Sequence, residues 1–167
     1  MDAQPVLSLL ARVLQQSGLE AILIGNAAAA LQGAPVTTVD LDFLFRKTPK
    51  NVARLKAVAK ALGAVVLRPY YPASDLFRLV RDDDGLQVDF MGTIHGVRSF
   101  ESLRSRAQRL DFAGFAMLVA DLADVVRSKR AAGRPRDRAV LEILEKTLHE
   151  KTKAGQAAKA RRPPARK

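Results

Sequence analysis

The chain has 167 residues, which is enough for one domain with a substantial core but not comfortably for two. It contains no cysteine and only two histidines, His95 and His149. This excludes disulfides and cysteine-ligated zinc and argues against histidine-rich metal sites, so any bound metal must rely on oxygen ligands. The formal net charge is +11, but seven of the 28 Lys and Arg residues fall among the last 17 residues, which contain no acid.

The positive charge is therefore concentrated in the C-terminal segment. Residues 1–150 carry 21 basic against 17 acidic residues, whereas residues 151–167 are poor in apolar side chains and rich in Ala, Lys, Arg and Pro. Such a segment cannot bury enough surface to fold alone. We expect one domain over 1–150 and a disordered basic tail over 151–167. The tail could add electrostatic affinity for RNA, or it could act only as a solubilising segment without a fixed partner.

No segment predicts a signal peptide or a membrane span. The N-terminal sequence MDAQPVLSLLARVL lacks a basic region before its apolar residues, and no apolar run approaches the roughly 18 residues of a membrane span. We expect a soluble, cytoplasmic protein without a membrane partner.

Helical and strand patterns alternate along the chain, and Pro, Gly, Thr and Ser mark the helix ends. The predicted helices are 5–18, 26–32, 49–63, 99–106, 120–131 and 136–151. The predicted strands are 20–25, 38–46, 64–68, 75–80, 86–91, 107–112 and 115–118. Residues 81–85, RDDDG, predict a hairpin turn between the fourth and fifth strands, because Asp and Gly tolerate the positive φ of tight turns.

Two aspartates interrupt the second predicted strand. Side chains alternate along a strand, so Asp40 and Asp42 should share one face while Val39, Leu41 and Phe43 share the other. Two carboxylates at this spacing repel each other, and partial burial would raise their pKa values unless a cation neutralises them. Mg²⁺ suits such a pair, because it takes one or two carboxylates and completes its coordination with water and substrate phosphates.

A third carboxylate appears in the fifth predicted strand, where Asp89 stands alone among apolar residues. For an isolated D-x-D the simplest interpretation is a solvated strand face. The presence of Asp89 favours a shared acidic site instead. Asp82 to Asp84 are interpreted as turn residues rather than as metal ligands.

The segment before Asp40 contains a turn suited to an anion. The first predicted strand ends at Gly25 and Asn26 and passes directly into a short helix. Backbone N–H groups at a helix N-terminus favour an anion, and glycine lets the backbone approach it closely. An ordinary strand-to-helix connection explains the same residues equally simply.

The ordered set of motifs IGNAAAALQGAPVTTVDLDF, VDF and KRAAGRPRD resembles the minimal nucleotidyltransferases of the DNA polymerase beta superfamily, most closely the AbiEii-like toxins and related bacterial nucleotidyltransferase-like proteins. The resemblance spans about residues 20–145. It implies an α/β (α+β) fold, with a mixed sheet backed by helices and a C-terminal helical pair.

The resemblance also implies a site and a reaction. Asp40, Asp42 and Asp89 would be catalytic and would hold one or two Mg²⁺, and Asp89 would help to deprotonate an acceptor hydroxyl. A nucleoside triphosphate would be the substrate, and its nucleoside monophosphate would pass to the hydroxyl as pyrophosphate leaves. The acceptor would be a tRNA 3′ end, another RNA, a protein or a small molecule. A toxin–antitoxin or phage-defence role, with an antitoxin or other protein as partner, would follow from the same resemblance.

Further nucleotide-binding residues are implied at both ends of the motif set. Gly25, Asn26 and Thr38 would contact the triphosphate, and the nucleotide-binding set would be completed by Lys129, Arg134 and Asp137. For the two cations a solvated basic patch is the competing interpretation. Asp137 is also explained by its position at the start of a helix, where an acid is favourable.

The sequence departs from the family pattern at two positions. Asn26 stands where Gly or Ser is usual, and Val36 stands where many relatives carry Arg. The alternative function is therefore a catalytically weak nucleotide-binding or regulatory module with the same fold. A purely basic nucleic-acid binder is a third alternative, supported only by the tail, because aromatic residues form just 5% of the chain.

Overall fold

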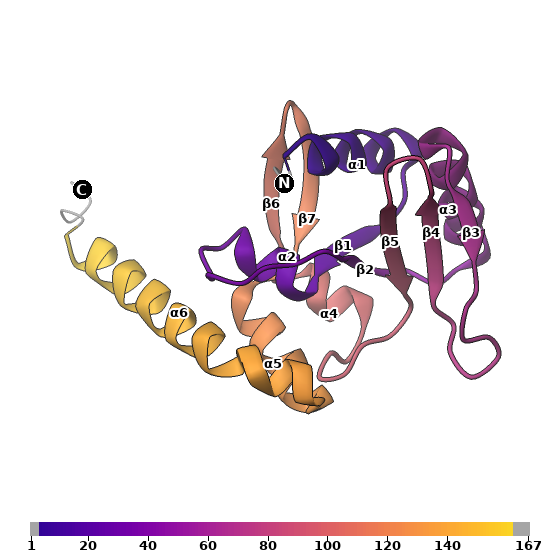
Figure 1. Ribbon diagram of the computed structural model, residues 1–167. Coiled ribbons are helices and arrows are strands. Elements are labelled where there is room, and N and C mark those ends of the chain that lie inside the picture. Colours follow the sequence, from indigo (N-terminus) through magenta and orange to yellow (C-terminus); the bar gives the residue numbers. More distant parts are fainter. Residues whose placement is uncertain (1–3, 162–167) are drawn as a thin grey trace.

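The computed structural model describes residues 4–161 and contains one mixed sheet with helices on both faces (Figure 1). The strands are β1 (Ala21–Ile24), β2 (Leu41–Phe45), β3 (Val65–Leu67), β4 (Phe77–Arg81), β5 (Leu86–Met91), β6 (Gln108–Phe112) and β7 (Phe115–Val119). The helices are α1 (Gln4–Ser17), α2 (Gly25–Ala30), α3 (Pro49–Leu62), α4 (Phe100–Arg104), α5 (Leu122–Ala132) and α6 (Pro135–Ala160). The predicted α/β fold with a C-terminal helical pair is confirmed.

The sheet has the order β3-β4-β5-β2-β1-β7-β6. The pairs β2–β5 and β1–β7 are parallel, and the other neighbouring pairs are antiparallel. The two central strands, β1 and β2, thus each have one parallel neighbour, which they can reach only through long connections in the chain. This arrangement brings the ends of β1, β2 and β5 together although they are far apart in sequence.

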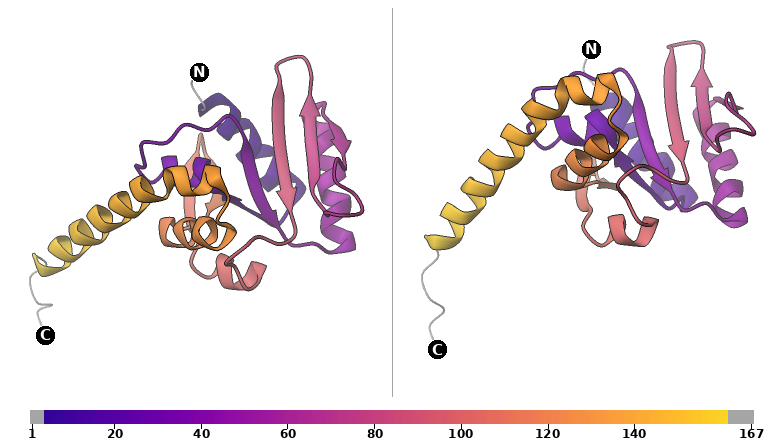
Figure 2. Two further views of the ribbon diagram at one scale, coloured as in Figure 1. Left: turned by 60° about the horizontal axis from the view of Figure 1, so that its bottom comes forward. Right: turned by 90° about the horizontal axis from the view of Figure 1, so that it is seen from below.

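Aromatic packing anchors the middle of the sheet. The rings of Phe43 and Phe90 stack with their centroids 5.1 Å apart, and Phe45 meets Phe77 edge to face at 5.7 Å. α1 packs against β7 and α3, whereas α2 packs against β1, β2 and α5. The second view of Figure 2 shows α5 and α6 in front of the sheet with α1 and α3 behind it. The candidate site lies on the face of α2 and α5.

Local sequence signals account for the helix that connects β2 to β3. Thr48 caps α3, since its hydroxyl accepts a hydrogen bond from the Asn51 backbone N–H at 3.2 Å, and Pro49 occupies the first turn. Gly63 ends the helix in the left-handed conformation with φ of 65°. Asn51 itself is buried and donates to the carbonyls of Glu20 and Arg46, which ties the helix to both central strands.

The second strand is shorter than predicted. It begins at Leu41, so Thr38 and Asp40 lie in the preceding loop, and Val39 is 94% exposed instead of packing in the core. On one side the strand lacks a neighbour, because β1 turns into α2 after Ile24, which pairs with Asp42. On the other side β5 extends back to Leu86. The expectation that Asp40 and Asp42 alternate along one strand is therefore wrong for Asp40.

The C-terminal segment differs from the predicted disordered tail. Residues 151–160 continue α6, which projects from the body of the protein (Figures 1 and 2), while residues 162–167 lie outside the described residues. Low apolar content prevents burial, but it does not prevent a helix from continuing past its packed portion. Once a helix is nucleated, each further residue adds a hydrogen bond without a new nucleation cost, and Ala, Lys and Gln are good helix formers.

None of the helices within residues 4–161 is both long and apolar enough to cross a membrane. α6 has the length, at 26 residues, but its sequence is rich in charged side chains.

Candidate active site

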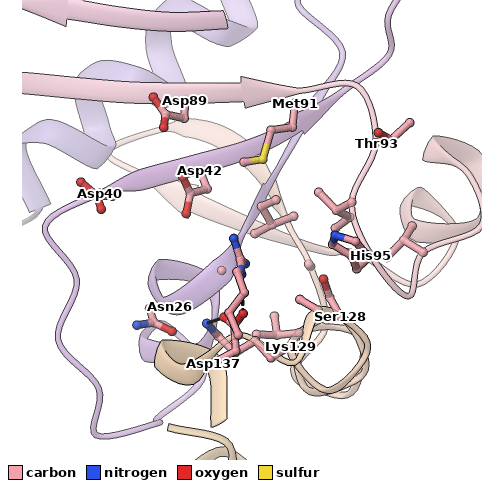
Figure 3. Close-up of a pocket in the computed structure, with 18 of the residues that line it drawn as sticks. Asn26, Asp40, Asp42, Asp89, Met91, Thr93, His95, Ser128, Lys129 and Asp137 are labelled. Atoms are coloured by element: carbon pink, nitrogen blue, oxygen red, sulfur yellow. Dashed lines mark hydrogen bonds and ion pairs between the residues drawn. The ribbon is translucent and has the colours of Figure 1, made fainter. Parts of the chain in front are cut away.

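A pocket of about 500 Å³ opens between the end of the central strands and helices α2, α5 and α6. All nine site residues predicted from the sequence line it: Gly25, Asn26, Thr38, Asp40, Asp42, Asp89, Lys129, Arg134 and Asp137. Figure 3 shows the three acids Asp40, Asp42 and Asp89 on one side of the pocket, and Asn26, Lys129 and Asp137 on the other. The sheet thus supplies an acidic wall, and the helices supply the wall that faces it.

Strand register places two of the acids side by side. Asp42 of β2 and Asp89 of β5 are direct partners in the parallel pair, so their side chains leave the same face of the sheet. Asp42 is also the partner of Ile24, the last residue of β1. The beginning of α2 therefore lies beside the Asp42 carboxylate.

Gly25 is required at this junction for two reasons. Its φ is +68°, a conformation that side chains with a Cβ rarely adopt. A Cβ at this position would also lie 3.1 Å from Oδ2 of Asp42. The glycine thus lets the turn into α2 pass directly against the carboxylate.

Two of the carboxylates have no partner. Within residues 4–161, neither the Asp40 nor the Asp42 side chain accepts a hydrogen bond or forms an ion pair, although Thr38 holds the Asp40 backbone through a 2.6 Å bond from its hydroxyl to the Asp40 carbonyl. Burial, together with the charges of Asp89 and Asp40, raises the pKa of Asp42 to about 6, with Arg136 and Lys129 acting in the opposite direction. The Asp42 carboxylate therefore lies at the start of β2 without an ion-pair partner in the described residues.

The third carboxylate is neutralised within the sheet. Arg78 of β4 lies directly opposite Asp89 in the antiparallel pair, and its Nε and Nη2 donate to the two Asp89 oxygens at 2.8 and 2.7 Å. The same ion pair holds the pKa of the Arg78 guanidinium above its usual value. Asp89 thus shares the pocket with Asp42, but it meets a fixed cation there.

These donors fit a metal ion that is completed by substrate. No group of three or more His, Asp or Glu side chains in residues 4–161 is arranged to hold a metal by itself. The unpaired carboxylates of Asp40 and Asp42 are nevertheless hard oxygen ligands beside an open pocket, and their repulsion would be relieved by a divalent cation. They suit Mg²⁺ bound through two carboxylates, water and phosphates. A role for Asp89 as a third ligand stays a prediction.

Asp137 organises the opposite wall. It is 1% exposed and accepts hydrogen bonds from Lys129 Nζ at 3.2 Å and Arg134 Nε at 2.6 Å. Burial acts to raise the pKa of Asp137, but these two bonds and the charges of the cations outweigh it and hold that pKa below its usual value. One buried carboxylate therefore fixes two cations at the pocket, which leaves that group of three with one net positive charge.

Asn26 and Val36 are the two departures from the family pattern. The Asn26 amide donates to the Thr37 carbonyl at 3.4 Å, and its Oδ1 is buried without a hydrogen-bond partner in the described residues. Val36 packs against the hydrophobic core as a partly buried side chain. Asn26 therefore holds the loop that precedes Asp40, while Val36 contributes packing and no charge.

Sequence analysis missed several residues of the pocket. Arg78, Asp124 and Arg136 all line it. Arg136 forms no ion pair within residues 4–161, whereas Asp124 is 2% exposed and binds Arg106 and Arg127. Only Arg78 had a usable signal, because a hairpin centred on RDDDG places it directly opposite Asp89.

No protein-family model matches the chain, and no curated protein matches it in sequence. Solved structures do match in architecture. A protein of Thermotoga maritima assigned as a nucleotidyltransferase superimposes with a TM-score of 0.61 at 21% identity, over 87% of this chain and 92% of that one. The chain has the nucleotidyltransferase fold.

Two further structures share the nucleotidyltransferase fold with this chain. The antibiotic-resistance factor ANT(2″)-Ia, solved in complex with adenylyl-2″-tobramycin, has a TM-score of 0.60 at 15% identity, over 92% of this chain and 94% of that one. The lincosamide adenylyltransferase LnuA, solved with lincomycin, has a TM-score of 0.55 at 11% identity, over 80% of this chain and 90% of that one. The resemblance found in the sequence motifs is thus confirmed at the level of the fold.

Proposed function

We propose that this protein is a Mg²⁺-dependent nucleotidyltransferase that moves a nucleoside monophosphate from a nucleoside triphosphate to a hydroxyl acceptor. One observation carries the proposal, namely that the unpaired carboxylates of Asp40 and Asp42 face a cationic wall across one pocket of the nucleotidyltransferase fold. A nucleoside triphosphate with its Mg²⁺ would fit between the two walls, because the unpaired carboxylates could bind the metal and the cations could bind the phosphates.

Each wall of the pocket has its own task. Asp40 and Asp42 would hold Mg²⁺, which would neutralise the negative charge of the phosphates. Gly25 brings the backbone of the α2 turn close to the same place, and Asn26 and Thr38 border it. Lys129 and Arg134, held by Asp137, would bind the triphosphate, and Arg136 is an additional cation that has no acidic partner in the described part of the chain.

Asp89 would orient the acceptor hydroxyl and take up its proton. Its place beside Asp42 supports this role. The paired Arg78 keeps the Asp89 carboxylate in a fixed orientation through two hydrogen bonds. Transfer then forms the bond between the acceptor oxygen and the α-phosphorus, and pyrophosphate leaves.

For the acceptor we propose the 3′ end of tRNA or another RNA. The surplus of basic residues after residue 150 supports a polyanionic acceptor. A toxin–antitoxin role stays a prediction that rests on the resemblance to AbiEii-like proteins alone.

The test is transfer of label from each α-³²P nucleoside triphosphate to total cellular RNA and protein in the presence of Mg²⁺. We expect label with the wild-type protein, none with Asp42→Asn, and wild-type labelling with Asp82→Asn, which removes an exposed acid in the β4–β5 turn. Labelling that is unchanged in Asp42→Asn would contradict the proposal. The same gel identifies the base and the class of acceptor.

A second candidate is a nucleotide-binding module without transfer activity. The ion pair between Arg78 and Asp89 favours it, because it already occupies the carboxylate that would receive the acceptor proton. This candidate predicts Mg²⁺-dependent binding of a nucleotide with no labelled product. Binding can be measured by titrating a fluorescent ATP analogue. Asp42→Asn should lose this binding whether the protein is a transferase or only a binding module.

A further inference from the structure

The last ten residues of α6 and Arg161, which follows it, form an exposed extension, here called the basic arm (residues 151–161). Every residue of the arm is exposed. It contains four cations, Lys151, Lys153, Lys159 and Arg161, and no acid. We propose that the basic arm binds the phosphate backbone of an RNA whose end reaches the pocket. This inference deepens the proposed function, on which it rests, by assigning a surface to the acceptor.

The arm has a fixed connection to the site. Lys151 Nζ donates to Oε1 of Gln32 at 2.8 Å, and the Gln32 amide donates to the Ala120 carbonyl at 2.7 Å. Gln32 follows α2, whose first residues line the pocket. α6 therefore leaves the body beside the pocket, and Figure 2 shows the arm projecting beyond every other element.

The distance between the pocket and the cations of the basic arm favours a polymeric acceptor over a small molecule. Arg136 lines the pocket in the first turn of α6. At a rise of 1.5 Å per residue, Lys153 lies about 26 Å and Lys159 about 35 Å further along the helix. A drug-sized acceptor in the pocket cannot touch both, whereas a nucleic acid strand can follow the helix over this length.

The composition of the arm disfavours other partners. Its only aliphatic side chains are those of four alanines, so it has no apolar stripe that could enter a protein groove or a coiled coil. A helix that inserts into a membrane interface needs large apolar residues opposite its basic face, and these are also missing from the arm. Charge is the recognition property that the arm offers, and three of its cations, Lys153, Lys159 and Arg161, form no ion pair within residues 4–161.

The test compares two triple variants that remove equal charge. One is Lys153→Gln/Lys159→Gln/Arg161→Gln in the arm, and the other changes Lys50, Lys56 and Lys60 to Gln on α3, behind the sheet. All six side chains are exposed. The probe is a fluorescein-labelled RNA hairpin with a single-stranded 3′ end, and binding is measured by fluorescence anisotropy between 50 and 200 mM KCl.

We expect the arm variant to lose about tenfold in affinity at 50 mM KCl and to reduce the salt slope by about two, because three phosphate contacts are removed. The α3 variant should bind like the wild type. Equal losses in both variants, or no RNA binding by the wild type, would overturn the inference. The inference would also be overturned if light scattering showed a dimer for the wild type and the α3 variant but a monomer for the arm variant. Tighter binding of the wild type to phosphatidylserine vesicles than to RNA would overturn it as well.

A separate measurement keeps this test independent of the proposed function. Binding of a fluorescent ATP analogue with Mg²⁺ depends on the pocket, so the arm variant should retain it. If the wild type binds an analogue of none of the nucleoside triphosphates while RNA binding depends on the arm, the proposed transfer activity fails and only RNA binding by the arm stands. If nucleotide binding is present while the arm variant binds RNA like the wild type, only the arm inference fails.

Discussion

Arg78 and Asp89 face each other across the β4–β5 pair and share two hydrogen bonds of 2.8 and 2.7 Å, with side chains that are 23% and 11% exposed. Removing one member of a largely buried pair leaves the other charge uncompensated. We therefore expect Arg78→Gln to lower the free energy of unfolding by about 3 kcal/mol.

The double variant Arg78→Gln/Asp89→Asn should recover much of this loss, because no isolated charge is left behind. Lys146→Gln, which breaks the exposed pair with Glu142 on α6, should leave the unfolding midpoint unchanged. Urea unfolding measures all three. Additive losses in the double variant would show that the pair is not coupled.

The raised pKa of Asp42 predicts how stability changes with pH in the absence of Mg²⁺. The folded state holds the proton with a pKa of about 6 and the unfolded state with a pKa of 3.8, so the favourable contribution of Asp42 is complete below pH 4 and is lost as pH rises through 6. Asp42→Asn should therefore match the wild type near pH 4 and exceed it by about 2 to 3 kcal/mol at pH 8. Urea unfolding in EDTA at both pH values measures this, and a difference that does not change with pH would contradict the assigned burial.

Gly25 allows a prediction with a matched control. Gly25→Ala combines a strained φ of +68° with a close contact to Asp42, whereas Gly63→Ala has a similar φ of +65° and no atom within 4 Å of the new Cβ. Both should lose about 1 kcal/mol from backbone strain. Only Gly25→Ala should also weaken Mg²⁺-dependent nucleotide binding, measured with a fluorescent ATP analogue. Equal nucleotide affinity in the two variants would show that the close contact has no functional effect.

Asp137 is predicted to position cations and not to contact the nucleotide. Asp137→Asn would leave Lys129, whose side chain is 13% exposed, without its counter-charge, so stability should fall by about 3 kcal/mol. Adding Lys129→Met should restore stability, but it should not restore nucleotide affinity. Thermal unfolding and nucleotide titration separate the two effects. Restored affinity in the double variant would exclude Lys129 from phosphate binding.

The sequence predicted every helix and strand that the structure describes, and it located boundaries that carry local signals better than boundaries that depend on tertiary pairing. The predicted caps Thr48 and Ser99 correctly located the starts of two helices, because the bonds that define a cap lie within four residues. The start of β2 was predicted too early, since strand length depends on how far the neighbours extend. The end of α6 was predicted near residue 151 because the segment after it has too few apolar residues to be buried. A helix that has already formed can continue without burial, and α6 extends to Ala160.

The same distinction applies to the pocket. The motifs, and the family resemblance that they carry, identified nine residues that line it. The pairing of Arg78 with Asp89 could have been inferred from the register of the RDDDG hairpin. The pairing of Asp137 with Lys129 could not, because it depends on the packing of α5 on α6. The unpaired state of Asp42, which carries the functional proposal, is a property of three-dimensional packing alone.

α6 is a single continuous helix from Pro135 to Ala160, so it fixes the distance between the pocket and the basic arm. The first turn of α6 borders the pocket and its last turn is about 35 Å away. The number of residues between them therefore sets the distance between the 3′ end of a bound RNA and the phosphates that the basic arm contacts. One inserted residue would lengthen the helix by only about 1.5 Å but would swing its outer half through about 100° around the axis. An insertion therefore changes the direction in which the arm's cations point more than it changes their distance from the pocket. Only insertions close to a whole number of helical turns would keep the cations of the basic arm on the same side of the helix.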